Sequence, residues 1–422
     1  MSDKIKKLFK AGFFDVFGAS LINNIINFLA GFILIRILSK PEYGLFTYVW
    51  NIYNLIMLLC GLGFESGFLQ IASERSKDSS FVNSLYGYSN RIGNLFNLLL
   101  SALMAFVAIF IPLKMHDADK LLLLISLLPL IQFLFRMLSV YLRSLKENRK
   151  YAVLTNINTI LVAACTILGA YTYREKGLIL GYYVAFSCTI LVALLVLKIP
   201  VSFSGNPGND EKRDLFNISI ISVCNNSLSQ LLYLLDVFMI GIVISDESIL
   251  ATYKVATVIP TAMMFIPQSV IVFIYPYFAE HRLDKKWCVN NYKKLMFYYA
   301  LANVVITSVV FLLAPFIITV VHGSQYLDAV PAFRILVISY FFSATFRTTS
   351  GNLLVTQRKL TFNLIVSIIT GLANVVADYF FITNMGSIGA AYATLAIIIL
   401  GGTISTPYLI HCFANIKDLE EQ

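Results

Sequence analysis

The sequence has few charged residues for its length, and this absence sets the broad class of the protein. Of 422 residues, 13% are charged and 58% are hydrophobic, and the mean hydropathy is +0.77. A soluble domain of this size carries roughly twice that charged fraction. The composition therefore excludes an ordinary soluble protein and predicts an integral membrane protein.

Motifs of several chemical activities are also missing. The sequence contains no Gly-x-x-x-x-Gly-Lys-Ser/Thr phosphate loop, so it hydrolyses no nucleotide by that route. It contains no His-x-x-x-His or Cys-x-x-Cys spacing, and its four histidines are scattered near the ends of apolar segments. No connection is long enough to hold the catalytic carboxylate pair of a glycosyltransferase or polymerase. We therefore predict no catalytic residues, no metal site and no cofactor.

The six cysteines do not form a disulfide framework. Five of them lie in apolar segments, where cysteine behaves as a small hydrophobic residue. The sixth, Cys288, lies in a charged connection that we expect in the cytoplasm, where thiols stay reduced.

Twelve apolar segments are long enough to cross a bilayer, which takes about 20 residues. The first follows a lysine-rich start, but its apolar run is about 26 residues long, whereas the apolar part of a signal peptide is roughly 7–15. We therefore expect an uncleaved span. The segments are 13–38, 45–72, 82–111, 121–142, 152–173, 178–197, 215–244, 249–279, 294–321, 329–350, 360–383 and 387–413.

The second half of the chain resembles the first. The fourteen residues 35–48 match residues 240–253 at six positions, among them Glu42/Glu247 and Tyr48/Tyr253. Further along, the offset changes from 205 to 209, and Arg149-Lys150 then aligns with Arg358-Lys359. The alternative is a chance likeness between apolar helices. Parallel repeats are typical of transporters, which bind substrate between their halves.

We therefore predict an all-α integral membrane protein with twelve transmembrane helices in two six-helix, pseudo-symmetric lobes. The first lobe covers residues 1–197 and the second covers residues 215–422. Residues 198–214, which are rich in turn formers and charges, form the predicted cytoplasmic linker between the lobes.

Basic residues indicate the orientation, because lysine and arginine accumulate in cytoplasmic loops. With both termini in the cytoplasm, the inner segments contain 21 lysines and arginines and the outer loops contain 5. This bias accounts for most of the net charge of +9, and no nucleic-acid partner is needed to explain it.

Several charged residues remain inside the predicted spans, where they are costly and are candidates for function. We expect the cations to line a cavity and to hold a phosphate-bearing ligand, for which the arginine guanidinium is well suited. The acids are candidates for coupling transport to a gradient of H⁺ or Na⁺. Alternatively, the charges pair and lock neighbouring helices, Glu65 with Arg91 and Asp236 with Lys254. The cations are Arg91, Arg136, Arg347, Arg36 and Lys254, and the acids are Asp236, Glu65 and Asp378.

Uncharged polar residues add a second candidate feature. Span one contains Asn23, Asn24 and Asn27, and its repeat partner, span seven, contains Asn225 and Asn226. Asparagine in hydrocarbon needs a hydrogen-bond partner, so these residues either join helices or form a polar gate or cavity wall. Prolines and glycines are expected to break several spans, including those at Gly61, Gly63, Gly371 and Gly401-Gly402.

Five short motifs lie along the whole chain: 36–46 (RILSKPEYGLF), 61–63 (GLG), 275–276 (YP), 323–336 (GSQYLDAVPAFRIL) and 374–394, which begins NVV and ends GSIGAAYAT. They resemble motifs of polysaccharide flippases of the Wzx type, which share a superfamily with multidrug extruders and the peptidoglycan lipid flippase. The resemblance implies a MATE-like fold, alternating access, and movement of an undecaprenyl-pyrophosphate-linked oligosaccharide to the outer leaflet of the bacterial cytoplasmic membrane. It implies membrane lipids, a polysaccharide polymerase and a chain-length regulator as partners, in O-antigen (lipopolysaccharide), capsule or exopolysaccharide synthesis. A drug or metabolite exporter on the same fold is the alternative, and a membrane glycosyltransferase is less favoured.

Overall fold

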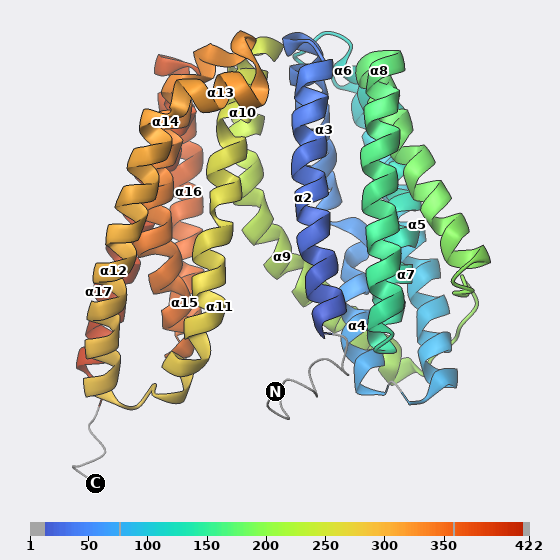
Figure 1. The fold of residues 1–422 in the computed structure, drawn as a ribbon. Coiled ribbons are helices and arrows are strands. Elements are labelled where there is room, and N and C mark those ends of the chain that lie inside the picture. Colours follow the sequence, from blue (N-terminus) through green and yellow to red (C-terminus); the bar gives the residue numbers. More distant parts are fainter. Residues whose placement is uncertain (1–12, 76, 358, 417–422) are drawn as a thin grey trace. The chain divides into compact units, whose positions relative to one another are not determined.

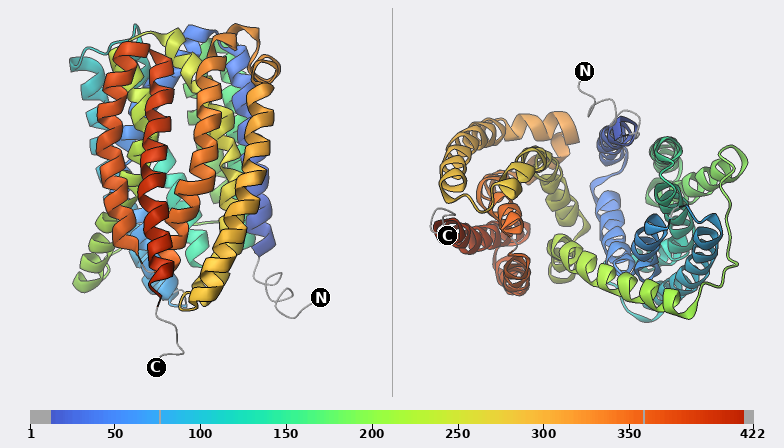
Figure 2. Two further views of the ribbon diagram at one scale, coloured as in Figure 1. Left: turned by 90° about the vertical axis from the view of Figure 1, so that its left-hand side faces the viewer. Right: turned by 90° about the horizontal axis from the view of Figure 1, so that it is seen from below.

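The computed structural model describes residues 13–75, 77–357 and 359–416 of the chain. These residues form two compact units, 1–234 and 235–422, and each unit is described by itself. The secondary-structure elements of the described residues are all helices or helical turns. Within each unit the long helices run roughly alongside one another, as spans of a bilayer do (Figure 1 and Figure 2).

The first unit contains most of the predicted spans one to six. Its helix α2 packs along α8, and α7 packs against α4, α5 and α8. In chain order the elements are α2 (Phe13–Ile37), α3 (Lys40–Met57), the 3₁₀ turn η1 (Cys60–Gly63), α4 (Phe64–Glu74), α5 (Ser79–Phe110), α6 (Ala118–Ile125), α7 (Leu128–Ser144) and α8 (Asn148–Leu195).

The turn between α2 and α3 accounts for part of the first motif. The Ser39 side chain accepts a hydrogen bond from the Glu42 backbone at 3.5 Å, and Glu42 accepts one from the Ser39 backbone at 2.8 Å. This is a capping box, which satisfies two free donors at a helix start. Arg174 joins the turn from α8, because its guanidinium lies 3.6 Å from Glu42 and donates to the Ile37 carbonyl at 2.8 Å.

The predicted span 45–72 of the first unit is interrupted at Gly61 and Gly63, where the sequence predicted a break. Gly61 and Gly63 have positive φ angles of 54° and 75°, and the chain changes direction between α3 and α4. A Cβ on Gly61 would overlap the ring of Phe133, so this position requires glycine. In contrast, α16 and α17 continue through Gly371 and Gly401-Gly402, so the expected breaks there are wrong.

Helix α8 contains two predicted spans, which are joined at a sharp reversal. Tyr173 and Arg174 have non-helical backbone angles, and Arg174 has a φ of 53°. The two limbs pack directly on each other, because a Cβ on Gly169 would overlap the Gly177 backbone. Glycine at both positions therefore lets the limbs approach closely.

Residues 196–208 are not helical and lie on α5. The Asn90 side chain donates to the Ser202 carbonyl at 3.0 Å, and the Asn206 backbone donates to the Ser84 hydroxyl at 3.1 Å. The chain then forms α9 (Asn209–Val243), whose Ser227 hydroxyl donates to the Leu58 carbonyl at 2.8 Å. The compact units divide inside α9, at Leu234, and the boundary of the lobes at 198–214 stays a prediction.

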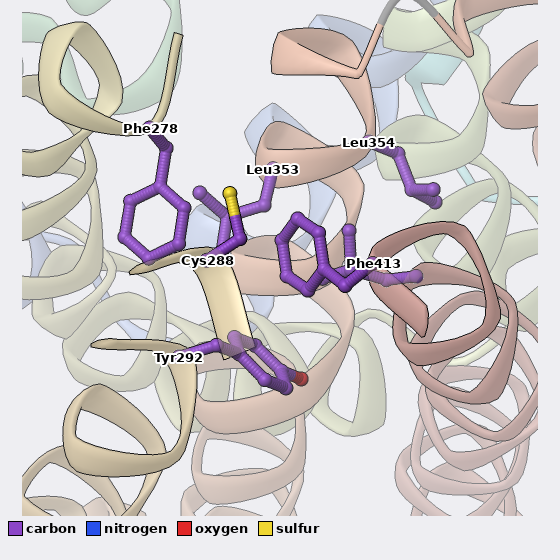
Figure 3. Close-up of a cluster of buried hydrophobic side chains, with 7 residues drawn as sticks. Phe278, Cys288, Tyr292, Leu353, Leu354 and Phe413 are labelled. Atoms are coloured by element: carbon purple, nitrogen blue, oxygen red, sulfur yellow. The ribbon is translucent and has the colours of Figure 1, made fainter. Parts of the chain in front are cut away.

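The second unit contains the later spans. In chain order its elements are α10 (Glu247–Met263), α11 (Phe265–Glu280), α12 (Lys285–Leu312), α13 (Ala314–His322), the 3₁₀ turn η2 (Ser324–Ala329), α14 (Val330–Phe342), the π-helical turn η3 (Ser343–Thr348), α15 (Thr349–Thr356), α16 (Leu360–Met385) and α17 (Ser387–Ala414). Figure 3 shows part of its core, where side chains from α11, α12, α15 and α17 converge.

The described residues contain nine helices that are long and apolar enough to cross a membrane. One of them is α8, whose two limbs correspond to two predicted spans. Shorter apolar segments, Ile22–Ile37 of α2 and Leu234–Val243 of α9, lie in the predicted spans one and seven. The predicted fold class is therefore confirmed: the chain is a multi-pass, all-α membrane protein.

Candidate functional site

Four helices of the second unit bring two predicted coupling acids to one place. Asp236 of α9 accepts three hydrogen bonds. The Thr394 hydroxyl of α17 donates to its Oδ2 at 2.7 Å, and the Tyr253 hydroxyl of α10 donates to the same oxygen at 2.9 Å. The Asn374 amide of α16 donates to its Oδ1 at 3.1 Å. These contacts hold the Asp236 carboxylate in one orientation.

Asp378 lies one helical turn after Asn374 and shares its amide. The Asn374 amide donates to Asp378 Oδ2 at 2.9 Å, so one amide group bridges the two carboxylates. The side chain of Asp378 is fully buried, and its Oδ1 has no hydrogen-bond partner among the described residues. A buried carboxylate that lacks partners is costly, and a bound proton or cation would offset that cost.

The donor set indicates which ions suit this carboxylate cluster, which we define as Asp236, Tyr253, Asn374, Asp378 and Thr394. It offers carboxylate, amide and hydroxyl oxygens, which are the ligands of hard cations. In the part of the chain that the structure describes, no three or more His, Cys, Asp or Glu residues are grouped as a metal site. The oxygen donors of the cluster are therefore suited to a proton or a hard cation such as an alkali ion.

A second charged site lies in the first unit. The Arg136 guanidinium of α7 lies 3.5 Å from the Glu65 carboxylate of α4, and their side chains are 40% and 23% exposed. One turn before Arg136, Gln132 accepts a hydrogen bond from the Tyr53 hydroxyl of α3 at 2.5 Å. Arg136 is therefore partly open to solvent while a carboxylate neutralises and positions it.

The predicted pair of Glu65 and Arg91 is wrong. Glu65 pairs with Arg136 because α4 packs against α7. Arg91 is exposed on α5, and its guanidinium lies 5.7 Å from the ring centre of Tyr88. Lys212, at the start of α9, lies at the same distance from that ring, so Arg91 belongs to a basic surface beside the linker.

The predicted pair of Asp236 and Lys254 is also wrong. Within the described residues, no carboxylate lies within the 4 Å salt-bridge distance of the half-buried Lys254 amine. Its neighbour Tyr253 makes the contact with Asp236 instead. Consecutive helical residues point in directions about 100° apart, so one helix cannot present both to the same carboxylate.

Two other predicted cations are Arg36 and Arg347. Arg36 is exposed in the last turn of α2. Arg347 is half-buried on the π-helical turn η3, and an ideal Cβ on Gly401 of α17 would lie 3.1 Å from its Nε. Glycine in α17 therefore gives the Arg347 side chain its room.

The asparagines of span one have different surroundings. Asn24 and Asn27 are exposed, and Asn23 is half-buried. The Asn23 side-chain oxygen is buried without a hydrogen-bond partner among the described residues. The side chains of Asn225 and Asn226 lie outside the described residues. A gating role for these five residues stays a prediction.

The sequence analysis missed three members of the carboxylate cluster. Tyr253 appeared only as a repeat match, and Asn374 and Thr394 appeared only within a family motif. One signal was present, because Asn374 and Asp378 are four residues apart and so share a helix face.

The chain matches a family model described as "Polysaccharide biosynthesis protein" over residues 33–331. The chain belongs to this family. No curated protein sequence matches it.

Solved structures of the MOP superfamily share the fold of this polysaccharide biosynthesis protein. An inward-facing multidrug resistance transporter of the MATE family has a TM-score of 0.72 and 11% identity, with 94% of this chain and 96% of that chain covered. The lipid II flippase MurJ in an inward closed conformation has a TM-score of 0.71 and 17% identity, with 94% and 88% covered. A MOP superfamily transporter from Pyrococcus furiosus has a TM-score of 0.58 and 12% identity, with 95% and 94% covered.

At these identities the likeness shows the fold alone. The predicted MATE-like architecture is confirmed, and so is the predicted likeness to a polysaccharide biosynthesis family.

Proposed function

We propose that this protein is a flippase that moves an undecaprenyl-pyrophosphate-linked oligosaccharide from the inner to the outer leaflet of the bacterial cytoplasmic membrane. Its membership of a polysaccharide biosynthesis family supports the substrate class. A fold shared with transporters, and with a protein described as a lipid II flippase, supports translocation by alternating access. In this proposal the protein is not an enzyme, and both of its termini are cytoplasmic.

The buried carboxylate cluster is the observation that most strongly supports coupling to an ion gradient. It joins α9, α10, α16 and α17 through the side chains of Asp236, Tyr253, Asn374 and Thr394. A cation or proton bound by Asp236 and Asp378 would therefore affect the packing of four helices at once. A ligand shifts a conformational equilibrium only through unequal affinity for the two states, and such a site allows that difference.

Arg136 is the best-placed cation for the diphosphate of the substrate. Its guanidinium can form paired hydrogen bonds with phosphate oxygens, and Glu65 holds it in place until an anion competes for it. Aromatic rings lie nearby in the same unit. The ring centre of Trp50 is 5.0 Å from that of Tyr53 and 4.6 Å from that of Tyr182. Such rings commonly line binding pockets, and here they suit sugar rings.

Deletion of the gene, with complementation, tests the proposal. Surface polysaccharide and the lipid-linked repeat unit on the inner leaflet would be measured in the same cells. We expect loss of the glycan and accumulation of the lipid intermediate, both reversed by the wild-type gene. A strain that keeps its glycan and accumulates no intermediate, in a background without a second flippase, would favour a drug or metabolite exporter.

The pathway partners belong to the same proposal. A flippase of this class supplies repeat units to a polysaccharide polymerase and a chain-length regulator. Cross-linking in intact cells, followed by identification of the captured proteins, would test these two partners, and their absence would remove them from the scheme.

A further inference from the structure

A groove lies on the outside of the second unit between α11 and α12. It has a volume of about 440 Å³, and its lining residues on α12 include Trp287, Asn291, Lys294, Tyr298 and Ala302. On α12 the lining residues recur every three or four positions from 287 to 302, so they form one helix face about 22 Å long. On α11 the lining residues are Ile274, Tyr277 and Phe278, so α11 flanks one end of the groove and the rest of it follows the face of α12.

The groove crosses the expected level of the lipid headgroups. Residues 295–312 of α12 form an apolar stretch about 27 Å long, close to the roughly 30 Å of a bilayer's hydrocarbon core. Lys294 therefore lies at the boundary between hydrocarbon and headgroups, on the side that we expect to be cytoplasmic. Tyr298 and Ala302 line the groove inside the hydrocarbon, and Trp287 and Asn291 line it at the cytoplasmic side.

The cytoplasmic end of the groove is firmly built. The Trp287 ring is stacked on His281 with 4.2 Å between ring centres, and it meets Phe278 edge-on at 5.1 Å. Phe278 belongs to the core cluster of Figure 3, together with Tyr292 of α12. A preformed site loses less entropy on binding than a flexible one, so this end is suited to hold a ligand.

Charge and exposure indicate the kind of ligand. Lys294 is exposed, and the described residues that line the groove include no acid to neutralise it. Only 11% of the apolar window of α12 is buried within the chain, against 33–61% for the other candidate spans. The ligand therefore carries negative charge at the headgroup level and an apolar chain above it, and it reaches the groove from the bilayer.

We propose that this groove docks the lipid carrier of the substrate, a polyprenyl diphosphate, in the inner leaflet. Its phosphate groups lie at Lys294, its isoprenoid chain follows Tyr298 and Ala302, and its attached sugar extends past Trp287. This inference rests on the proposed function, and it names the place where the lipid is held before translocation.

Fluorescence of Trp287 provides a direct binding test, because the chain has only two tryptophans. In a Trp50→Phe background of the full-length protein, Trp287 is the one tryptophan left. The protein would be placed in nanodiscs of phosphatidylcholine and titrated with undecaprenyl diphosphate. We expect a saturable change in emission. Lys294→Gln should weaken binding about fivefold, because a lysine near a membrane surface contributes about 1 kcal/mol to the attraction of anionic lipid.

Matched variants separate the groove from general effects. Lys286→Gln removes an exposed charge from the same helix outside the groove and should leave binding unchanged. Ala302→Phe should fill the hydrocarbon end of the groove and weaken binding, whereas Leu301→Phe, on a neighbouring exposed face, should not.

Two further ligands test the assigned occupant. Equal binding of phosphatidylglycerol would overturn it in favour of a general anionic-lipid site, and equal binding of inorganic pyrophosphate would overturn the role of the chain. Wild-type affinity in Lys294→Gln would overturn the site itself. Complementation distinguishes the two proposals. If the deletion strain loses its glycan and the groove variants restore it fully, only the groove proposal is refuted. If the deletion strain keeps its glycan while lipid binding still depends on the groove residues, only the flippase proposal is refuted.

Discussion

Replacing Asp378 by asparagine removes one negative charge from the carboxylate cluster and keeps the shape of the side chain. The substituted amide oxygen can still accept the hydrogen bond that the Asn374 amide donates at 2.9 Å. Because that bond is kept, and because the buried charge is removed, we expect folding stability to change by no more than about 1 kcal/mol. Expression and membrane insertion should therefore remain normal.

Asp378→Asn should weaken ion binding much more than it changes folding stability. Two unit charges about 4 Å apart interact by about 4 kcal/mol at the effective dielectric of about 20 that describes protein sites. Water penetration and relaxation around the half-buried Asp236 reduce this interaction energy. We take half of it, about 2 kcal/mol, as the loss in the variant. A loss of that size weakens cation binding about 30-fold.

Thermal unfolding of the purified protein provides the assay. A cation that binds only the folded state stabilises it by about 2.7 kcal/mol at one hundred times its dissociation constant. The Tm of the wild type should therefore rise with NaCl and not with choline chloride if Na⁺ is the coupling ion. If the ion is H⁺, the Tm should depend on pH and not on NaCl. At the same cation concentration a site that is about 30-fold weaker stabilises by only about 0.9 kcal/mol, so Asp378→Asn should lose about two-thirds of the response to the cation.

A control and a refuting result complete this test. Asp284 caps the start of α12 through a hydrogen bond to the Trp287 backbone at 2.8 Å, and asparagine is an equally good cap. Asp284→Asn therefore removes a carboxylate of the same unit without disturbing the cluster, and it should keep the full ion response. A full response in Asp378→Asn as well would refute the ion site.

The other predictions concern the first unit. Arg136→Gln should lower lipid translocation about tenfold or more at normal protein level, because a charge-assisted hydrogen bond to phosphate contributes about 1.5–3 kcal/mol. Transport at the wild-type rate in proteoliposomes would remove Arg136 from substrate binding. Gly61→Ala should destabilise the protein by about 1–3 kcal/mol, because the backbone has a positive φ and the new Cβ overlaps Phe133. Gly31→Ala, where a Cβ meets nothing within 4 Å in helix α2, should be neutral or stabilising, and equal Tm losses for the two variants would contradict this reasoning.

Hydrophobic periodicity and length were enough to predict the spans, because a bilayer demands long apolar helices whatever their partners. The interruption at Gly61 was predictable for a similar reason, since Gly-Leu-Gly is a poor helix former. Gly401 is different. It lies inside the continuous helix α17, where its missing side chain makes room for Arg347, and only the packing distinguishes the two roles.

The pairing of charges could not be predicted in the same way. The expected pairing of Glu65 with Arg91 joined two consecutive predicted spans, but the rotation of each helix decides which side chains meet. In the structure α4 presents Glu65 to α7, where Arg136 lies. Likewise, α10 presents Tyr253 to Asp236. Helix rotation depends on tertiary packing, which a single sequence does not specify.

The internal repeat carries the carboxylate cluster in one half only. At the offset of 209 residues, Asp378 corresponds to Gly169 and Thr394 corresponds to Ala185. Gly169 packs so closely on Gly177 that even a Cβ would overlap the neighbouring backbone, so the first unit has no room for a second carboxylate there. We therefore expect one ion site per chain. The ion-dependent rise in stability should follow a simple binding curve with a Hill coefficient of about one, because cooperativity requires at least two sites. A coefficient near two in the monomeric protein would show that a second site exists outside this cluster.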